Sequence, residues 1–102
     1  MMAPYALLLR WRLKPGRYED FAEAWEAVTL AMLADDSLGS SLFEAEDGTV
    51  YALARWPDKA VRERAFTDHV VATARGVMLE AVAETFPAVE MKECINLWVP
   101  PA

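Results

Sequence analysis

The amino-acid sequence predicts an α+β domain of ferredoxin-like topology, with the element order βαββαβ. Runs of apolar or alternating residues, typical of strands, flank a stretch with the three-and-four spacing of an amphipathic helix. The pair Asp47-Gly48 lies between two of these strand-like runs, and Asp-Gly is a strong signal for a tight β-hairpin. With 102 residues, the chain is predicted to form one domain over residues 1–102.

The first predicted strand, Tyr5–Leu13, carries apolar side chains on both faces and ends at Pro15-Gly16. One face carries Leu7, Leu9, Trp11 and Leu13, and the other carries Ala6, Leu8, Arg10 and Arg12. A strand that is apolar on both faces needs cover on both. Because one layer of helices covers only one face, the sequence predicts that the second face packs against another copy in a homodimer.

A helix is predicted over Tyr18–Leu33, where apolar residues recur along one stripe and acidic residues fall mostly outside it. Strands over Gly39–Glu44 and Thr49–Trp56 follow, joined by a two-residue turn in which Asp47 and Gly48 both take positive φ. This pairing places Ala52, Ala54 and Trp56 on the same sheet face as Leu9 and Trp11.

The second helical region is predicted to be broken. Pro57 ends the preceding strand, and Asp58 is placed to cap a helix that starts at Lys59. Thr67-Asp68 interrupts the apolar spacing, which then continues as far as Phe86-Pro87. A last strand is predicted over Val89–Val99.

Composition excludes several classes of protein. The net charge of −6 makes the chain poorly suited to bind nucleic acid or anionic lipid. Cys94 is the only cysteine, so no intrachain disulfide can form, which fits a cytoplasmic protein. No signal peptide and no apolar stretch of the ~18 residues needed to span a membrane is found. Hydrophobic residues make up 55% of the chain, an excess that again favours a partner chain.

Several short segments resemble the antibiotic biosynthesis monooxygenase family. They are Arg12-Leu13-Lys14-Pro15-Gly16, the helix positions Phe21, Trp25 and Thr29, Leu38-Gly39-Ser40, Glu46-Asp47-Gly48-Thr49 and Arg55-Trp56-Pro57-Asp58. The resemblance covers nearly the whole chain. It implies a homodimer whose two sheets pack together as a dimeric α+β barrel, with a pocket between each sheet and its own helices.

Within that family, some members oxidise polycyclic phenols or quinols with dioxygen and no cofactor, others degrade haem, and others have no established reaction. Haem-degrading members have an Asn in the first strand, where this chain has Leu9, and a His in the helix after Trp56, where this chain has Ala65. We therefore expect no haem turnover and no cofactor. The Asn, Trp and Tyr set of the phenol-oxidising members also has no clean counterpart.

His69, the only histidine, is the candidate general base, because histidine titrates near neutrality and could take a phenolic proton. A lone histidine is a poor metal site, so no metal is expected. On the other interpretation, His69 is a partly exposed residue at a helix start. If it is the base, His69→Ala should slow oxidation by about 10²-fold or more.

The candidate substrate-binding residues are small or aromatic. Ala52 and Ala54 leave volume beneath the first helix, which either forms a ligand pocket or is filled by aromatic side chains. Trp56 either walls that pocket or packs in the core. The full candidate set is Trp11, Trp25, Ala52, Ala54, Trp56 and Phe66.

The charged residues of the opposite sheet face, Arg10, Arg12 and Arg55, are expected to form interface ion pairs rather than to bind a substrate anion. Asn96 could touch the pocket or the dimer edge. Two functions stay open: a cofactor-independent monooxygenase acting on an aromatic phenol or quinol, and a non-catalytic small-molecule binder or structural homodimer of the same fold.

Overall fold

The computed structural model describes residues 4–99 and contains five strands and three helices in that range. In chain order they are β1 (Tyr5–Leu13), α1 (Tyr18–Leu33), β2 (Ser40–Glu44), β3 (Val50–Trp56), α2 (Lys59–Ala65), α3 (His69–Leu79), β4 (Val82–Thr85) and β5 (Val89–Lys92). The predicted bounds of the first strand and the first helix are confirmed.

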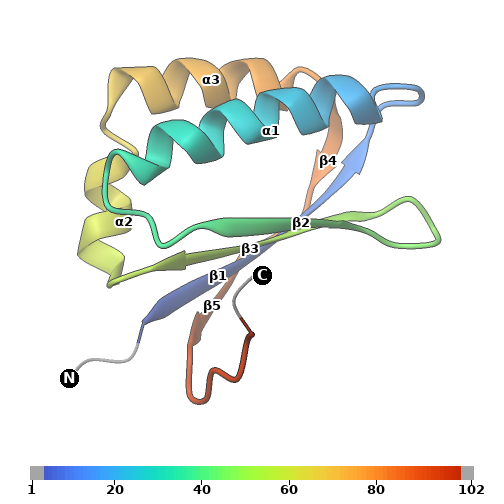
Figure 1. Ribbon diagram of the computed structural model, residues 1–102. Helices are drawn as coiled ribbons and strands as arrows, with labels where there is room; N and C mark the ends of the chain where they lie inside the picture. Colours follow the sequence, from blue (N-terminus) through green and yellow to red (C-terminus); the bar gives the residue numbers. More distant parts are fainter. Residues whose placement is uncertain (1–3, 100–102) are drawn as a thin grey trace.

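The strands form one antiparallel sheet in the order β2-β3-β1-β4, and β5 also pairs with β1. β4 and β5 are two pieces of one edge, so the topology is the predicted ferredoxin-like one. Helices α1 and α3 lie together over one face of the sheet, and no helix lies on the other (Figure 1). The sheet of the single chain is open, and its closure into a barrel with a second copy stays a prediction.

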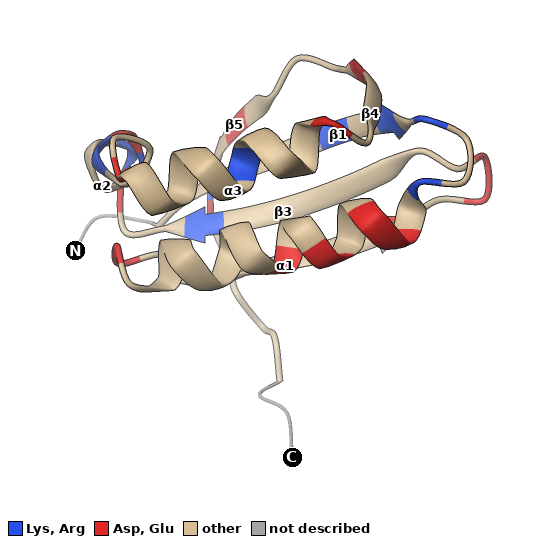
Figure 2. Cartoon of the chain, turned by 90° about the horizontal axis from the view of Figure 1, so that it is seen from above, with Lys and Arg blue, Asp and Glu red and all other residues tan. Residues whose placement is uncertain are grey.

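The register confirms which side chains share a face. Leu9 lies opposite Ala52, and Trp11 lies opposite Val50, so these residues face the helices. Seen from above, β3 runs between α1 and α3 (Figure 2). The small side chains Ala52 and Ala54 therefore lie beneath the two helices, and both are buried.

Turn and cap residues set the helix ends. Gly16 has φ +72° and follows Pro15 in a turn closed by a hydrogen bond from Arg17 N to Lys14 O, 3.2 Å. Asp58 Oδ1 accepts a hydrogen bond from Val61 N at 2.9 Å, which confirms the predicted cap of α2. Asp68 caps α3 in the same way, through Val70 N at 2.8 Å, so the predicted break falls at the right place.

The β2–β3 turn differs from the predicted two-residue turn. Gly48 has φ +86°, whereas Asp47 does not have positive φ. Ala45 N donates to Thr49 O, and Gly48 N donates to Ala45 O, both at 2.9 Å. Three residues therefore close the hairpin, as a type I turn followed by a left-handed glycine. Thr49 N donates to Asp47 Oδ1, which favours this alternative.

The predicted end of the second helical region is wrong, and the predicted last strand, Val89–Val99, begins at the right residue but is too long. Helix α3 ends at Leu79, and the stretch after it forms β4. Backbone hydrogen bonds to β1 hold β4 at both ends, from Lys14 N to Ala81 O and from Phe86 N to Arg10 O. Pro87 has no N–H and separates β4 from β5. Strand β5 ends at Lys92 because its partner β1 begins at Tyr5. Glu93 N donates to Pro4 O, and residues 93–99 form no strand.

Residues 93–99 leave β5 and cross beneath the sheet, on the side away from the helices (Figures 1 and 2). Ile95, Leu97, Trp98 and Val99 are strongly exposed in this single chain, at 80%, 85%, 70% and 85%. Asn96 Oδ1 accepts a hydrogen bond from Trp98 N, so Asn96 shapes this segment and does not reach the helix side of the sheet.

Two of the three arginines of the open face form ion pairs within the chain, and ion pairs across an interface stay a prediction. Arg55 makes two hydrogen bonds to Glu93, at 2.9 and 2.8 Å. Arg12 pairs with Glu84 at 3.2 Å, and Arg10 donates to Pro87 O. Among residues 4–99, no helix is long and apolar enough to cross a membrane.

Candidate functional site

A cavity lies between the sheet and the helices, at the place where Ala52 and Ala54 leave room. Its floor comes from β1, β2, β3 and the end of β4, and its roof from α1, α2 with its C-cap residue Phe66, and α3. Its apolar lining is Leu9, Trp11, Trp25, Val28, Met32, Ala52, Ala54, Phe66 and Met78, and its polar lining is Ser40, Arg62, Arg75 and Thr85. Apolar walls with a few polar groups are typical of small-molecule sites.

Five of the six predicted substrate-binding residues line this cavity: Trp11, Trp25, Ala52, Ala54 and Phe66. The sixth, Trp56, is 1% exposed and belongs to the core. Its ring meets Phe66 edge-on at a centroid distance of 6.5 Å, so it supports a cavity wall from behind. Trp11 is fixed in a similar way by Phe21, at 5.1 Å.

His69 does not line the cavity. It is the first residue of α3, and its side chain is exposed. A general base acts within hydrogen-bond distance of the proton that it removes. The proposed role of His69 would therefore require the turn between α2 and α3 to rearrange, and that role stays a prediction.

Two arginines that the sequence analysis did not single out line the cavity. Arg62 of α2 has its Cζ 4.5 Å from the centroid of the Phe66 ring, and Arg75 of α3 has its Cζ 5.6 Å from the same centroid. The spacing of Arg62 and Phe66, four residues apart, predicts that the two share a helix face. No sequence signal places Arg75 there, because a break of unknown angle separates α2 from α3.

The cavity is small in this conformation. Its volume is about 80 Å³, whereas sites for drug-sized ligands span roughly 300–1,000 Å³ and a cavity of about 150 Å³ can bind benzene. A ligand must therefore displace lining side chains. Trp25 is only half-buried and is the largest side chain of the α1 wall, so it is placed to move.

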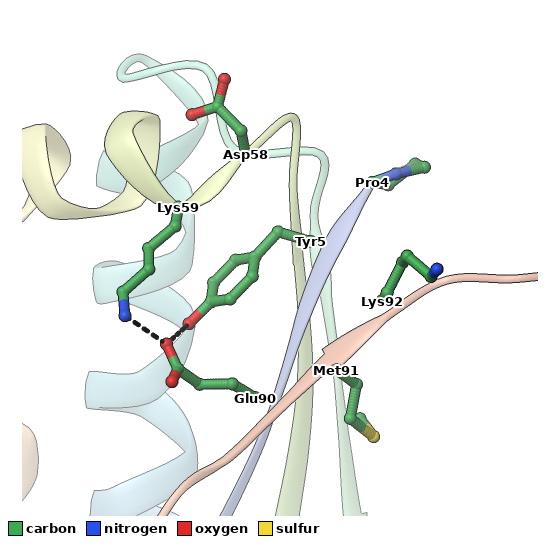
Figure 3. Close-up of a pocket in the computed structure, with 7 residues that line it drawn as sticks. All are labelled: Pro4, Tyr5, Asp58, Lys59, Glu90, Met91 and Lys92. Carbon is green, nitrogen blue, oxygen red and sulfur yellow. Dashed lines mark hydrogen bonds and ion pairs between the residues drawn. The ribbon is translucent and has the colours of Figure 1, made fainter. Parts of the chain in front are cut away.

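A second, more open hollow lies at the edge where β1 meets β5, beside the start of α2. Tyr5 Oη donates a 2.7 Å hydrogen bond to Glu90, and Lys59 Nζ lies 3.0 Å from the same carboxylate (Figure 3). Burial and the bond to Glu90 raise the pKa of Tyr5 to about 12. The same bond, together with Lys59, lowers the pKa of Glu90. These groups satisfy one another, and the hollow is open to solvent.

No metal-binding site is evident in the part of the chain that the structure describes. No group of three or more His, Cys, Asp or Glu side chains within residues 4–99 is arranged to hold a metal ion. What the cavity offers instead is aromatic surface, two guanidinium groups and the hydroxyl groups of Ser40 and Thr85.

Sequence comparison identifies no relative: no protein-family model matches the chain, and no curated protein matches it significantly. Comparison of structures finds proteins of the same fold. The cofactor-independent oxygenase SnoaB of Streptomyces nogalater superposes with a TM-score of 0.80 at 11% identity, over 93% of this chain and 97% of SnoaB.

Two further solved structures have the same fold as this chain. A candidate antibiotic biosynthesis monooxygenase of Chloroflexus aurantiacus has a TM-score of 0.82 at 12% identity, over 96% of this chain and all of that one. Rv0793 of Mycobacterium tuberculosis has a TM-score of 0.77 at 14% identity, over 94% of this chain and all of Rv0793.

The chain has the fold of the antibiotic biosynthesis monooxygenases. The resemblance predicted from short sequence segments is thereby confirmed at the level of fold. At such low identity, a shared fold does not carry a shared reaction, so any activity of this chain has to be argued from its own cavity.

Proposed function

We propose that the protein is a cofactor-independent monooxygenase that oxidises an aromatic phenol or quinol with dioxygen in the cavity beneath α1. The observation that supports this most is the lining itself: Trp11, Trp25 and Phe66 offer aromatic surface, and Arg62 and Arg75 offer positive charge in an otherwise apolar space. Its fold is that of SnoaB, which is described as a cofactor-independent oxygenase.

Ionisation of the substrate is the step that these residues can assist. A phenolate, unlike a phenol, can pass an electron to dioxygen. A positive charge nearby favours the ionised form of an acid. Arg62 and Arg75 therefore lower the pKa of a phenol bound against Phe66, and the released proton goes to water or to a base such as His69.

The electrons for the reaction come from the substrate. For an anthrone-type phenol, the substrate radical and superoxide combine at a ring CH₂ to give a hydroperoxide, which then loses water. One oxygen atom remains in the product as a carbonyl group, and the other leaves as water. The CH₂ group supplies both hydrogens of that water, so no external reductant is required.

Oxygen consumption tests the proposal. Purified protein, treated with a chelator and given no cofactor, is incubated with a panel of hydroquinones and anthrones in an oxygen electrode. We expect saturable consumption above autoxidation for at least one compound, with a product that has gained one oxygen and lost two hydrogens. Consumption no faster than in buffer across the panel would contradict the proposal.

The His69→Ala variant is assayed beside the wild type. A loss of about 10²-fold would identify His69 as a general base that reaches the cavity during turnover. A rate equal to that of the wild type would leave ionisation to the arginines.

We also propose that the protein acts as a homodimer through its open sheet face. Leu8 and Leu53 lie on this face, Phe43 and Met91 are exposed on it at 47% and 37%, and no helix covers it. The exposed apolar segment 95–99 extends from the same side. This face is the observation that favours the second candidate, a structural or ligand-binding dimer, if no oxidation is found.

A further inference from the structure

The cavity is lined by positively charged groups that form no ion pair with any carboxylate of residues 4–99. Arg62 and Arg75 both line it, and neither forms a salt bridge or a side-chain hydrogen bond within residues 4–99. Two guanidinium groups from different helices thus approach one ring, that of Phe66, in a protein whose net charge is −6. Two positive charges beside one ring attract an anion, although water screens the exposed Arg75 in part.

Polar atoms in the cavity wall lack partners as well. Within residues 4–99, five buried side-chain nitrogen or oxygen atoms have no hydrogen-bond partner, and two of them, Arg62 Nε and Ser40 Oγ, belong to residues that line this cavity. Buried polar atoms are normally hydrogen-bonded, and an exception calls for a ligand or water to complete it. Arg62 Nε is an N–H donor and Ser40 Oγ is a hydroxyl, and both belong to lining residues, so they suit a ligand with acceptor oxygens.

No acid within residues 4–99 forms an ion pair with Arg62. Arg62 acts electrostatically on Tyr5 and on Glu90, but Glu90 is already bonded to Tyr5 Oη and Lys59 Nζ. Glu63, the neighbouring acid on α2, is exposed and forms no recorded salt bridge in the described range. The charge of Arg62 is therefore left for a bound molecule.

We propose that this cavity selects aromatic molecules that carry a permanent anionic group, and specifically one-ring aromatic carboxylates. The ring lies against Phe66 and Trp25, and the carboxylate pairs with Arg62 and Arg75, of which Arg75 is exposed at the cavity mouth. The cavity volume of about 80 Å³ is below the roughly 150 Å³ of a cavity that binds benzene, so its walls must move even for one ring, and they must move least for a single ring. The inference rests on the proposed function, since it names the substrate class for the same site.

Binding of matched probes tests the inference without any turnover. Affinities are measured by calorimetry under argon for 2,5-dihydroxybenzoate against hydroquinone, and for benzoate against benzamide. We expect each carboxylate to bind at least about tenfold more tightly than its neutral counterpart, as a charged hydrogen-bonded pair provides. Equal affinities within each pair, or no binding of either carboxylate, would overturn the proposal.

Variants locate the anion site. Arg75→Gln, at an exposed position, and Arg62→Gln should each remove most of the preference for the carboxylate, and Arg62→Lys should restore part of it. Arg64→Gln is the matched control, because Arg64 is on α2 but not in the cavity lining. A preference that survives in both Gln variants, or that falls equally in Arg64→Gln, would contradict the assignment.

The two proposals fail in different ways. If the carboxylates bind with the expected preference and no compound of the panel consumes oxygen, the monooxygenase proposal fails and the anion site stands. If neutral hydroquinones are oxidised as fast as 2,5-dihydroxybenzoate at subsaturating concentrations, the anion site fails and the monooxygenase stands.

Discussion

At the scale of single residues, the Tyr5–Glu90–Lys59 cluster joins the sheet edge to α2. Tyr5 belongs to β1, Glu90 to β5 and Lys59 to the first turn of α2. The phenol keeps its proton because burial and the hydrogen bond to Glu90 both favour the neutral form. The cluster lies beside the cavity, since Arg62 acts on it from the same helix.

The Tyr5 phenol should titrate late. Its pKa is raised from 10.0 to about 12, so the folded protein keeps a proton that the unfolded chain loses. The stability that this provides is fully present below pH 10 and is lost as the pH rises through about 12. A tyrosinate absorbance titration should show a component near 12 that disappears in Tyr5→Phe. A wild-type titration with no component above 11 would contradict this account.

The cavity lining shows how far single residues can be predicted from sequence. Strand alternation was enough to place Ala52, Ala54 and Trp11 on one face, and helical spacing added Trp25. Trp56 lies on the same strand face as Ala52 and Ala54, yet it packs in the core. Alternation along a strand predicts which face a side chain is on, but not whether it lines a cavity or is fully buried. Arg75 depends on the packing of α3 against α1, which no local pattern encodes.

At the scale of elements, the two N-caps hold the broken helical region in place. Asp58→Ala should destabilise the protein by about 1 kcal/mol, since Val61 N loses its acceptor. Asp58→Asn keeps a side-chain oxygen at the same position and should cost far less. Chemical denaturation of both variants measures the difference, and equal losses would show that the cap contributes nothing specific.

A substitution at Gly76 is expected to stabilise helix α3 rather than to destabilise it. It lies in the helix interior, and a Cβ added there would meet no atom within 4 Å. Gly76→Ala should therefore stabilise the protein by about 0.5–1 kcal/mol. Thermal unfolding is the readout, with Gly48→Ala as a contrast: φ at Gly48 is +86°, so that variant should be destabilised. A lower melting temperature for Gly76→Ala would contradict the assigned helix.

Local sequence signals predicted the bounds of β1 and α1 correctly. Pro15-Gly16 ends β1, and an apolar stripe defines α1. The region after Leu79 was mispredicted for a physical reason. Val82 continues the helical spacing but also fits a short strand, and a short apolar run does not distinguish the two. A long-range contact determines that this run forms a strand, because it pairs with Arg12 and Leu13 of β1.

At the scale of the whole molecule, the open sheet face predicts a dimer. Sedimentation at micromolar concentration should show a particle of two chains. Leu53→Asp places a charge on this face and should weaken association, whereas Leu30→Asp, on the exposed side of α1, should not. A monomeric wild-type protein would contradict the dimer but not the fold.

Haem turnover gives a second test at this scale. Leu9 lines the cavity at the position that the family resemblance assigns to the Asn of haem-degrading members, and the cavity of about 80 Å³ is far too small for haem. We expect titration of haem in the presence of a reductant to give no ring opening. Stoichiometric binding followed by loss of the haem absorbance would show that the cavity opens much further than the structure indicates.

The central claim is that the cavity beneath α1 is the reaction site, and filling it tests that claim most directly. Ala52→Leu places a larger side chain in the cavity, and Ala83→Leu makes the same change at an exposed position of β4. Both variants are assayed for binding of 2,5-dihydroxybenzoate and for oxygen consumption, with circular dichroism to confirm folding. The account predicts that Ala52→Leu loses both activities while Ala83→Leu keeps them; a folded Ala52→Leu protein that binds and oxidises like the wild type would contradict it.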